Sequence, residues 1–108
     1  MGTPATNEVR VLGVDDQPIF LDVAREVVAA TPGFRWVGAA DSGAAAVAEV
    51  ERLDPALVLL DVHMPDMDGF ETARRISARR PDVVVVLVTM DVDPMLARAV
   101  ETSGAAVL

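Results

Sequence analysis

The 108-residue sequence contains no cysteine and no lysine. Without cysteine the chain can form neither a disulfide scaffold nor a thiolate metal site, which is typical of proteins of the reducing cytosol. No apolar segment approaches the roughly 20 residues that a membrane-spanning helix needs. The opening residues, MGTPATNEVR, lack the basic and apolar regions of a signal peptide. We therefore predict a cytoplasmic location and no membrane partner.

Positive charge is scarce as well, because nine arginines stand against 17 acidic residues, for a net charge of −8. Proteins bind nucleic acid mainly through cationic contacts to phosphates, so this balance argues against direct binding of DNA or RNA. Apolar residues, in contrast, make up 52% of the sequence and are sufficient for one buried core. We expect a flexible leader at residues 1–8 and a single domain at residues 9–108.

Apolar runs and helical patterns alternate along the chain. Strands are predicted at 9–14, 34–40, 56–61 and 83–89, with a short fifth strand from 105, and helices from Pro18 to just before Thr31, at 43–53, 70–79 and 94–102. Strands joined by such helices run parallel with right-handed crossovers, which gives an α/β fold with an open doubly wound sheet. The fully apolar segment 83–89 is predicted to be central and covered on both faces.

Polar residues stand where the predicted strands end. Asp15 and Asp16 follow the first strand, Asp61 ends the third, and Thr89 ends the fourth. Open parallel sheets carry their sites beyond the carboxyl ends of the strands, where the strand order reverses. We therefore expect the three carboxylates and the hydroxyl to lie close together. Each residue alone is also compatible with a structural role, as a turn former, a helix cap or an ordinary strand residue.

Three neighbouring carboxylates indicate phosphoryl chemistry. Two ionised carboxylates about 5 Å apart repel each other by roughly 3 kcal/mol at an effective dielectric constant near 20, so the group must bind a cation or raise a pKa. Oxygen ligands on loops favour Mg²⁺ over zinc or copper. Asp61 is the candidate nucleophile, which can form an acyl phosphate. Asp16, and Asp15 mainly through water, are the candidate Mg²⁺ ligands. The Thr89 hydroxyl is a candidate switch that moves towards the phosphoryl group.

The acidic loop after the third strand has simpler interpretations. Asp66 and Asp68 are expected to be turn and cap residues, with Asp68 capping the following helix. Gly69 is expected to supply unusual dihedral angles. The one histidine, His63, is expected to be an exposed loop residue whose side chain binds no metal.

With these residues, the sequence resembles the receiver domain of bacterial two-component response regulators from residue 9 to residue 108. The motifs that carry the resemblance are VDD (14–16), LLDVHMPDMDGFE (59–71), VTM (88–90) and SGA (103–105). The segments DDQPIF and TPGFRWVGAADSGAAAV further resemble the NarL/FixJ subfamily. The resemblance implies a CheY-like, flavodoxin-like sheet with the strand order 2-1-3-4-5.

The resemblance also implies a function. A histidine kinase would transfer a phosphoryl group to Asp61. Mg²⁺ would be held by Asp16 and Asp61, by Asp15 through water, and by the backbone carbonyl of His63, and Thr89 would be the switch hydroxyl. Such a domain is a signalling phosphoacceptor and not an enzyme, apart from its own phosphoryl transfer and autodephosphorylation. Its output would be transcription, through a DNA-binding domain that this chain does not contain.

The sequence departs from the family pattern in several places. The family has a lysine shortly after the position of Leu108 and an aromatic residue at that position, and this chain has neither, nor the last helix. Met90 stands where the family usually has a small residue, and it could narrow access to Asp61. His63 and Asp91 stand at positions that tune hydrolysis in the family.

These departures leave alternatives open. The chain is either a trimmed piece of a longer regulator or a degenerate pseudo-receiver, a protein-interaction or dimerisation module without phosphorylation. The absence of the last helix would leave one sheet face bare, which predicts a homodimer through residues 94–108.

A phosphatase of the haloacid-dehalogenase type also uses a strand-end aspartate and Mg²⁺. That family has a second aspartate two residues after the nucleophile, where this chain has His63.

Overall fold

The structure of the chain, a computed structural model, describes residues 8–88 and 106–107. Its strands are β1 (Val9–Val14), β2 (Phe34–Ala40), β3 (Leu57–Asp61), β4 (Val84–Val88) and β5 (Ala106–Val107), and its helices are α1 (Pro18–Ala29), α2 (Gly43–Leu53) and α3 (Gly69–Arg79). Each element lies where the sequence predicts it, with ends that differ only slightly. The predicted helix 94–102 and residues 1–7 of the predicted leader lie outside the described residues.

The five strands form one parallel sheet in the order β2-β1-β3-β4-β5. The register places Leu12 of β1 opposite Val58 of β3, and Val58 opposite Val85 of β4. After β1 the chain adds β2 on one side of β1, and it then adds β3 on the other side, so the strand order reverses between β1 and β3. The predicted doubly wound, flavodoxin-like fold is confirmed.

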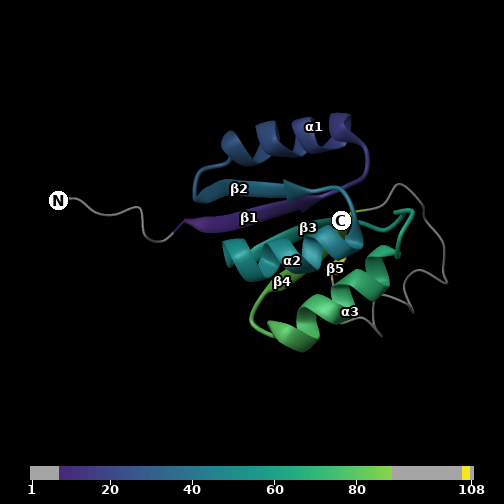
Figure 1. The fold of residues 1–108 in the computed structure, drawn as a ribbon. Coiled ribbons are helices and arrows are strands. Elements are labelled where there is room, and N and C mark those ends of the chain that lie inside the picture. Colours follow the sequence, from purple (N-terminus) through teal and green to yellow (C-terminus); the bar gives the residue numbers. More distant parts are fainter. Residues whose placement is uncertain (1–7, 89–105, 108) are drawn as a thin grey trace.

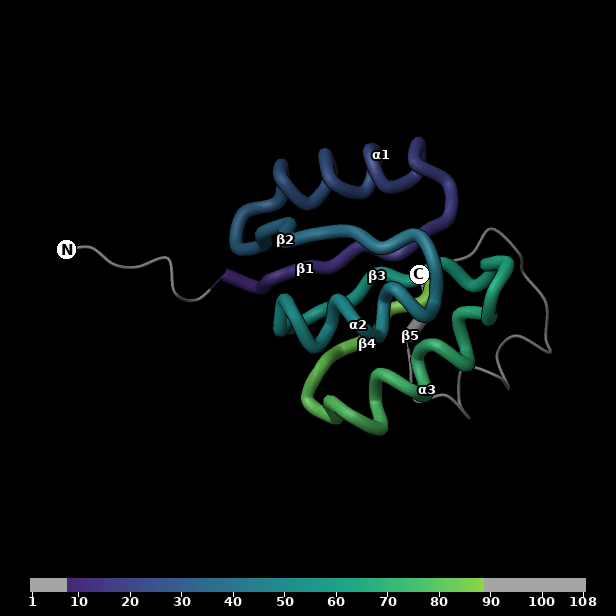
Figure 2. Tube along the Cα trace, in the orientation of Figure 1, coloured from purple at the N-terminus to yellow at the C-terminus, as the bar shows by residue number. Residues whose placement is uncertain are grey.

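The helices lie on both faces of the sheet. Figure 1 shows α1 on one face and α2 and α3 on the other, and the trace in Figure 2 shows the same three layers. Helix α1 contacts β1 and β2, whereas α3 contacts β3 and β4. No helix among the described residues is long and apolar enough to cross a membrane.

The core lies between the sheet and the pair α2 and α3. Residues in β3 and β4 alternate, and every second one is at most 4% exposed: Val58, Leu60, Val85 and Leu87. They pack with apolar residues of the two helices: Ala46, Val50, Ala73 and Ile76. Ala73 and Ile76 of α3 thus face the sheet and are almost fully buried. The position of β3 is therefore fixed mainly from this face.

The opposite face of β4 is only partly buried in the described part of the chain, so the prediction that this strand is buried on both faces is wrong. Val84 is 54% exposed and Val88 is 40% exposed. The reason lies in the placement of α1, the described helix on that face, which packs on β1 and β2. An apolar run shows that a strand lies inside the sheet, but it does not show that a helix covers both of its faces.

Helix α1 shows the same difference between pattern and burial. Its apolar residues recur at helical spacing, yet four of them are more than half exposed: Ile19, Phe20, Val23 and Val27. Val28 is the residue of this helix that is buried. The spacing therefore identified the helix, but not the side that packs on the sheet.

Candidate metal and phosphoryl-acceptor site

The register of the two central strands brings Asp15 and Asp61 together. Val14, the last residue of β1, pairs with Leu60 of β3, and both are buried. The next residue on each strand is therefore an aspartate at the same edge of the sheet. Asp16 follows in the turn that leads into α1, and its side chain is exposed. This edge is the carboxyl end of the strands, at the point where the strand order reverses.

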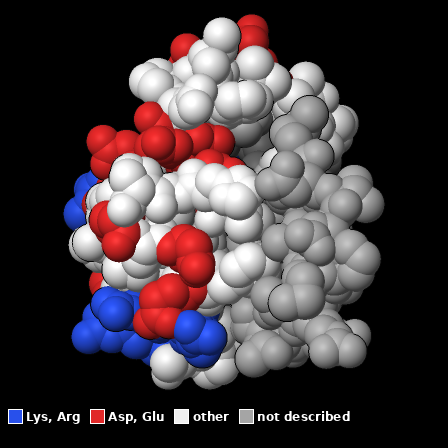
Figure 3. All heavy atoms as spheres, turned by 90° about the vertical axis from the view of Figure 1, so that its right-hand side faces the viewer, with Lys and Arg blue, Asp and Glu red and all other residues white. Residues whose placement is uncertain are grey.

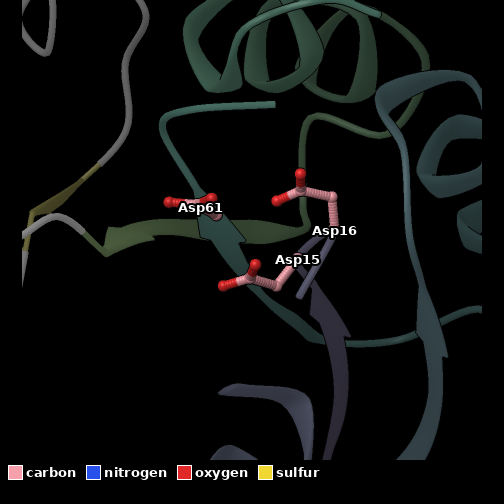
Figure 4. A group of neighbouring side chains, drawn as sticks. All are labelled: Asp15, Asp16 and Asp61. Atoms are coloured by element: carbon pink, nitrogen blue, oxygen red, sulfur yellow. The ribbon is translucent and has the colours of Figure 1, made fainter. Parts of the chain in front are cut away.

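The three carboxylates are close enough to share one cation. One oxygen from each of Asp15, Asp16 and Asp61 lies within 4.8 Å of the other two, and Figure 4 shows the side chains next to one another beyond the ends of β1 and β3. Two oxygens on opposite sides of a bound Mg²⁺ lie about 4.2 Å apart, so small side-chain rotations would suffice for coordination. All three donors are carboxylate oxygens, which hard cations such as Mg²⁺ prefer. The residues therefore fit this ion.

The electrostatics of the site also favour a cation. Partial burial raises the pKa of Asp61 above its ordinary value of 3.8, the backbone N–H of His63 opposes this shift, and the charge of Asp16 adds to it. Burial likewise raises the pKa of Asp15, against the effect of a hydrogen bond from the N–H of Gln17. That N–H donates to Oδ1 of Asp15 over 2.9 Å. Both shifts show that the charged forms lack compensation, which a divalent ion would supply.

The start of α3 packs directly behind the site. The N–H of Gly69 donates to the carbonyl oxygen of Val62 over 2.8 Å. A Cβ atom on Gly69 would lie 2.5 Å from the carbonyl oxygen of Asp61, so no larger residue fits without a backbone shift. The prediction of unusual dihedral angles at Gly69 is wrong, because the positive φ angles among the described residues are those of Asp54 and Gly33. Close approach to Asp61 is what requires glycine here.

The acidic loop between β3 and α3, residues 62–68, caps two helices. Oδ1 of Asp68 accepts a hydrogen bond of 2.8 Å from the N–H of Glu71, which confirms the predicted cap of α3. The fully buried Thr72, which the sequence did not single out, donates from its hydroxyl to the carbonyl oxygen of Asp68 over 2.9 Å. The carboxylate of Asp66 accepts from the backbone N–H groups of two residues at the start of α2. No local pattern connects Asp66 with that earlier helix.

The surface around the site is acidic on one side and apolar on the other. Figure 3 faces the strand ends and shows acidic side chains gathered there, with arginines at the lower margin. A groove of about 180 Å³ opens between α1 and the sheet, and its lining includes Phe20, Val88, Asp15 and Asp61. A larger open hollow of about 400 Å³, lined by residues of α1, α2 and the end of β2, contains none of the three site aspartates.

The residues predicted for the site have different outcomes. Asp15, Asp16 and Asp61 lie together, as the sequence predicts. His63 follows closely after Asp61 and is exposed, as expected. The other three predicted positions, Thr89, Met90 and Asp91, lie outside the described residues.

Comparison with known proteins agrees with this arrangement. The response regulator receiver domain family matches residues 11–107. The chain belongs to this family. The receiver domain is similar in structure to the signal receiver domain of the response regulator NarL from Mycobacterium tuberculosis, with a TM-score of 0.87 and 31% identity, over 94% of this chain and 82% of that one.

Curated relatives of the receiver domain have different outputs. The domain is 38% identical, over 93% of its length, to protein-glutamate methylesterase/protein-glutamine glutaminase 1 of Syntrophus aciditrophicus, of which it covers 29%. It is 30% identical, over 92% of its length, to the transcriptional regulatory protein DegU of Brevibacillus brevis, of which it covers 42%. The chain thus spans less than half the length of either relative.

Proposed function

We propose that this receiver domain is a phosphoacceptor in which Asp61 takes a phosphoryl group from a histidine kinase. The observation that carries the proposal is the cluster of three carboxylates, with one oxygen each within 4.8 Å of the others, at the carboxyl edge of the sheet. In this proposal Asp16 and Asp61 hold Mg²⁺ directly, Asp15 holds it mainly through water, and the backbone carbonyl of His63 completes the protein ligands. Bound Mg²⁺ would neutralise charge on the incoming phosphoryl group.

The proposed transfer forms one bond and breaks one bond. A carboxylate oxygen of Asp61 attacks the phosphorus atom of a phosphohistidine, the P–N bond breaks, and the released imidazole nitrogen keeps the electron pair and takes a proton from solvent. The end of β3 holds the attacking oxygen in place, because Leu60 beside it is fully buried and Gly69 packs against the carbonyl of Asp61. Apart from this transfer and the later hydrolysis of the acyl phosphate, which releases inorganic phosphate, the domain is not proposed to be an enzyme.

Three other residues with proposed roles, Thr89, Met90 and Asp91, lie outside the described part of the chain. Thr89 is proposed as the switch hydroxyl that hydrogen-bonds the phosphoryl group. Met90 is proposed to limit access to Asp61, and Asp91, together with His63, to tune hydrolysis. These assignments rest on the family pattern around the VTM motif.

For the output we propose transcription, in the cytoplasm, through a DNA-binding domain outside residues 1–108. The similarity to the transcriptional regulator DegU and to the receiver domain of NarL supports this output. Neither similarity assigns the chain to the NarL/FixJ subfamily, which remains part of the proposal. A methylesterase output is the second candidate, supported by the similarity to a protein-glutamate methylesterase over 93% of the chain.

Phosphorylation separates this function from that of a pseudo-receiver. The protein is incubated with acetyl phosphate and Mg²⁺, and its intact mass is measured. We expect the mass of one added phosphoryl group, which should not form when the metal is chelated beforehand or in the Asp61→Asn variant. Asp82→Ala, a change in the exposed turn before β4, is the control and should keep the adduct. If the wild-type domain forms no adduct at any Mg²⁺ concentration, also when extended beyond Leu108, it is a pseudo-receiver.

We also propose that the chain forms a homodimer through residues 94–108. The support is the exposed apolar surface on the α1 side of the sheet, formed by Val84 and Val88 of β4 and Phe20 of α1, since such patches promote association. Size-exclusion chromatography with light scattering should give the mass of two chains at micromolar concentration. A monomer at all concentrations would contradict this proposal and leave the phosphoacceptor role untouched.

A further inference from the structure

The N-terminus of α2 is capped from two directions. The first backbone N–H groups of a helix have no acceptor within the helix. After the cap residue Ser42 these groups belong to Gly43, Ala44 and Ala45. The N–H of Ala45 donates to Oγ of Ser42 over 3.1 Å, which is an ordinary local cap. The N–H groups of Gly43 and Ala44 each donate over 3.0 Å to a different carboxylate oxygen of Asp66, in the acidic loop after β3.

This contact between α2 and the acidic loop is also packed. A Cβ atom on Gly43 would lie 2.3 Å from Cγ of Met67 and 2.5 Å from Oγ1 of Thr72. Gly43 therefore leaves room for the loop and for α3 to approach the start of α2. The two hydrogen bonds of Asp66 form across this close approach. They also lower the pKa of Asp66, with the Gly43 N–H as the largest cause, so the carboxylate stays charged at neutral pH.

The same loop carries part of the proposed metal site. It leaves β3 at Asp61 and includes His63, whose backbone carbonyl is a proposed ligand. Its base is fixed, because Val62 is buried and accepts the hydrogen bond from the N–H of Gly69. The middle of the loop is more open, since Pro65 and Asp66 are exposed and Met64 and Met67 are half-buried. Among the described residues, the paired hydrogen bonds of Asp66 join this open part to the start of α2.

We propose that Asp66 is a positioning residue for the metal site: by binding the N–H groups of Gly43 and Ala44, it holds the acidic loop, and with it the His63 backbone, in place beside Asp61. The proposal rests on the proposed function, because it takes the His63 carbonyl as a ligand. Asp66 is not one of the three clustered carboxylates that would hold the metal. It acts through the loop, as groups that orient ligands do in other metal sites.

The chain offers a matched control for this proposal. Ser42→Ala removes a cap from the same end of the same helix without touching the loop, whereas Asp66→Ala removes a cap and the loop contact together. Loss of the Ser42 cap should lower the melting temperature by roughly 4–8 °C, and the Asp66 change should lower it by a similar amount. The two variants should differ in Mg²⁺ affinity, measured by isothermal titration calorimetry. We expect about 10-fold weaker binding for Asp66→Ala, little change for Ser42→Ala, and an intermediate value for Asp66→Asn, which keeps one acceptor oxygen.

Amide hydrogen exchange without metal gives an independent readout. Exchange at residues 62–67 should be faster in Asp66→Ala than in Ser42→Ala, whereas exchange within α2 should rise in both. Equal Mg²⁺ affinity and equal loop exchange in the two variants would overturn the proposal and make Asp66 a second cap only. A wild-type domain that binds no Mg²⁺ would refute the proposed function instead, and loop exchange alone would then decide whether Asp66 fixes the loop.

Discussion

The carboxylates of the site and the carboxylate in the middle of the acidic loop have surroundings with opposite effects on their pKa values. The site aspartates, Asp15 and Asp61, have raised pKa values because burial removes solvent and neighbouring carboxylates add negative charge. The loop aspartate Asp66 has a lowered pKa, because the N–H groups of Gly43 and then Ala44 donate to it. A carboxylate at a helix N-terminus stabilises the fold, whereas carboxylates that face one another destabilise it until a cation binds.

The largest loss of stability is expected from a change at Gly69, the first residue of α3, which packs against the end of β3. In Gly69→Ala, the new Cβ would lie 2.5 Å from the carbonyl oxygen of Asp61 and 2.8 Å from Cα of Val62. Both are backbone atoms, so the strand end or the helix must move. We expect the free energy of unfolding, measured by urea denaturation, to fall by about 2–3 kcal/mol. Asp82→Ala is the control. An unchanged urea midpoint would show that the backbone here adjusts easily. The acidic loop would then not rigidly connect the site carboxylates with Asp66.

The next largest effect is a change in melting temperature that differs in sign between a site aspartate and a capping aspartate. In the absence of metal, Asp61→Asn removes repulsion at the site and should raise the melting temperature by roughly 1–5 °C. Asp68→Ala removes the cap of α3 and should lower it. Millimolar Mg²⁺ should raise the melting temperature of the wild type and should raise that of Asp61→Asn less. A lower melting temperature for Asp61→Asn without metal would contradict the contrast between site carboxylates, which destabilise the fold, and capping carboxylates, which stabilise it.

The smallest effect is the expected dependence of these melting-temperature differences on pH. The folded-state pKa of Asp61 is raised, so the folded domain binds protons more tightly than the unfolded chain, and the penalty of the charged form is present at neutral pH and disappears as the pH falls through the raised pKa. The gain in melting temperature of metal-free Asp61→Asn over the wild type should therefore shrink from pH 7 towards pH 4. A gain that stays constant over this range would show that charge is not its cause.

Asp66 should show the opposite dependence on pH. Its folded-state pKa is lowered, so its stabilisation is present above the ordinary value of 3.8 and is lost as the pH falls through the lower folded-state value. The deficit in melting temperature of Asp66→Ala should therefore persist from pH 7 down to about pH 4 and fade only in stronger acid. Thermal denaturation of the wild type and both variants in one pH series measures the two trends together.

Much of the fold and of the site could be predicted because both depend on local patterns. Short apolar runs and helical spacing fixed the strands and helices, and the alternation of the two required a parallel sheet. Asp15 and Asp61 could be placed together because parallel strands end at a common edge. The exposure of Val84 and Phe20 could not be predicted, because hydropathy records what a residue can bury and not which helix lies over it. The partner of Asp66 was missed because it lies on an earlier helix.

The sequence by itself determined the order of the elements and the residues at the strand ends, because strand and helix periodicity and the aspartates after each strand are properties of short segments. Only the tertiary structure decided how the carboxylates differ. Asp61 faces other acids at an edge where two strands meet, and Asp66 faces the backbone N–H groups of α2 across a glycine contact. The physical reason is that the state of a carboxylate depends on the charges and dipoles within a few ångströms, and in this fold these come from distant parts of the chain.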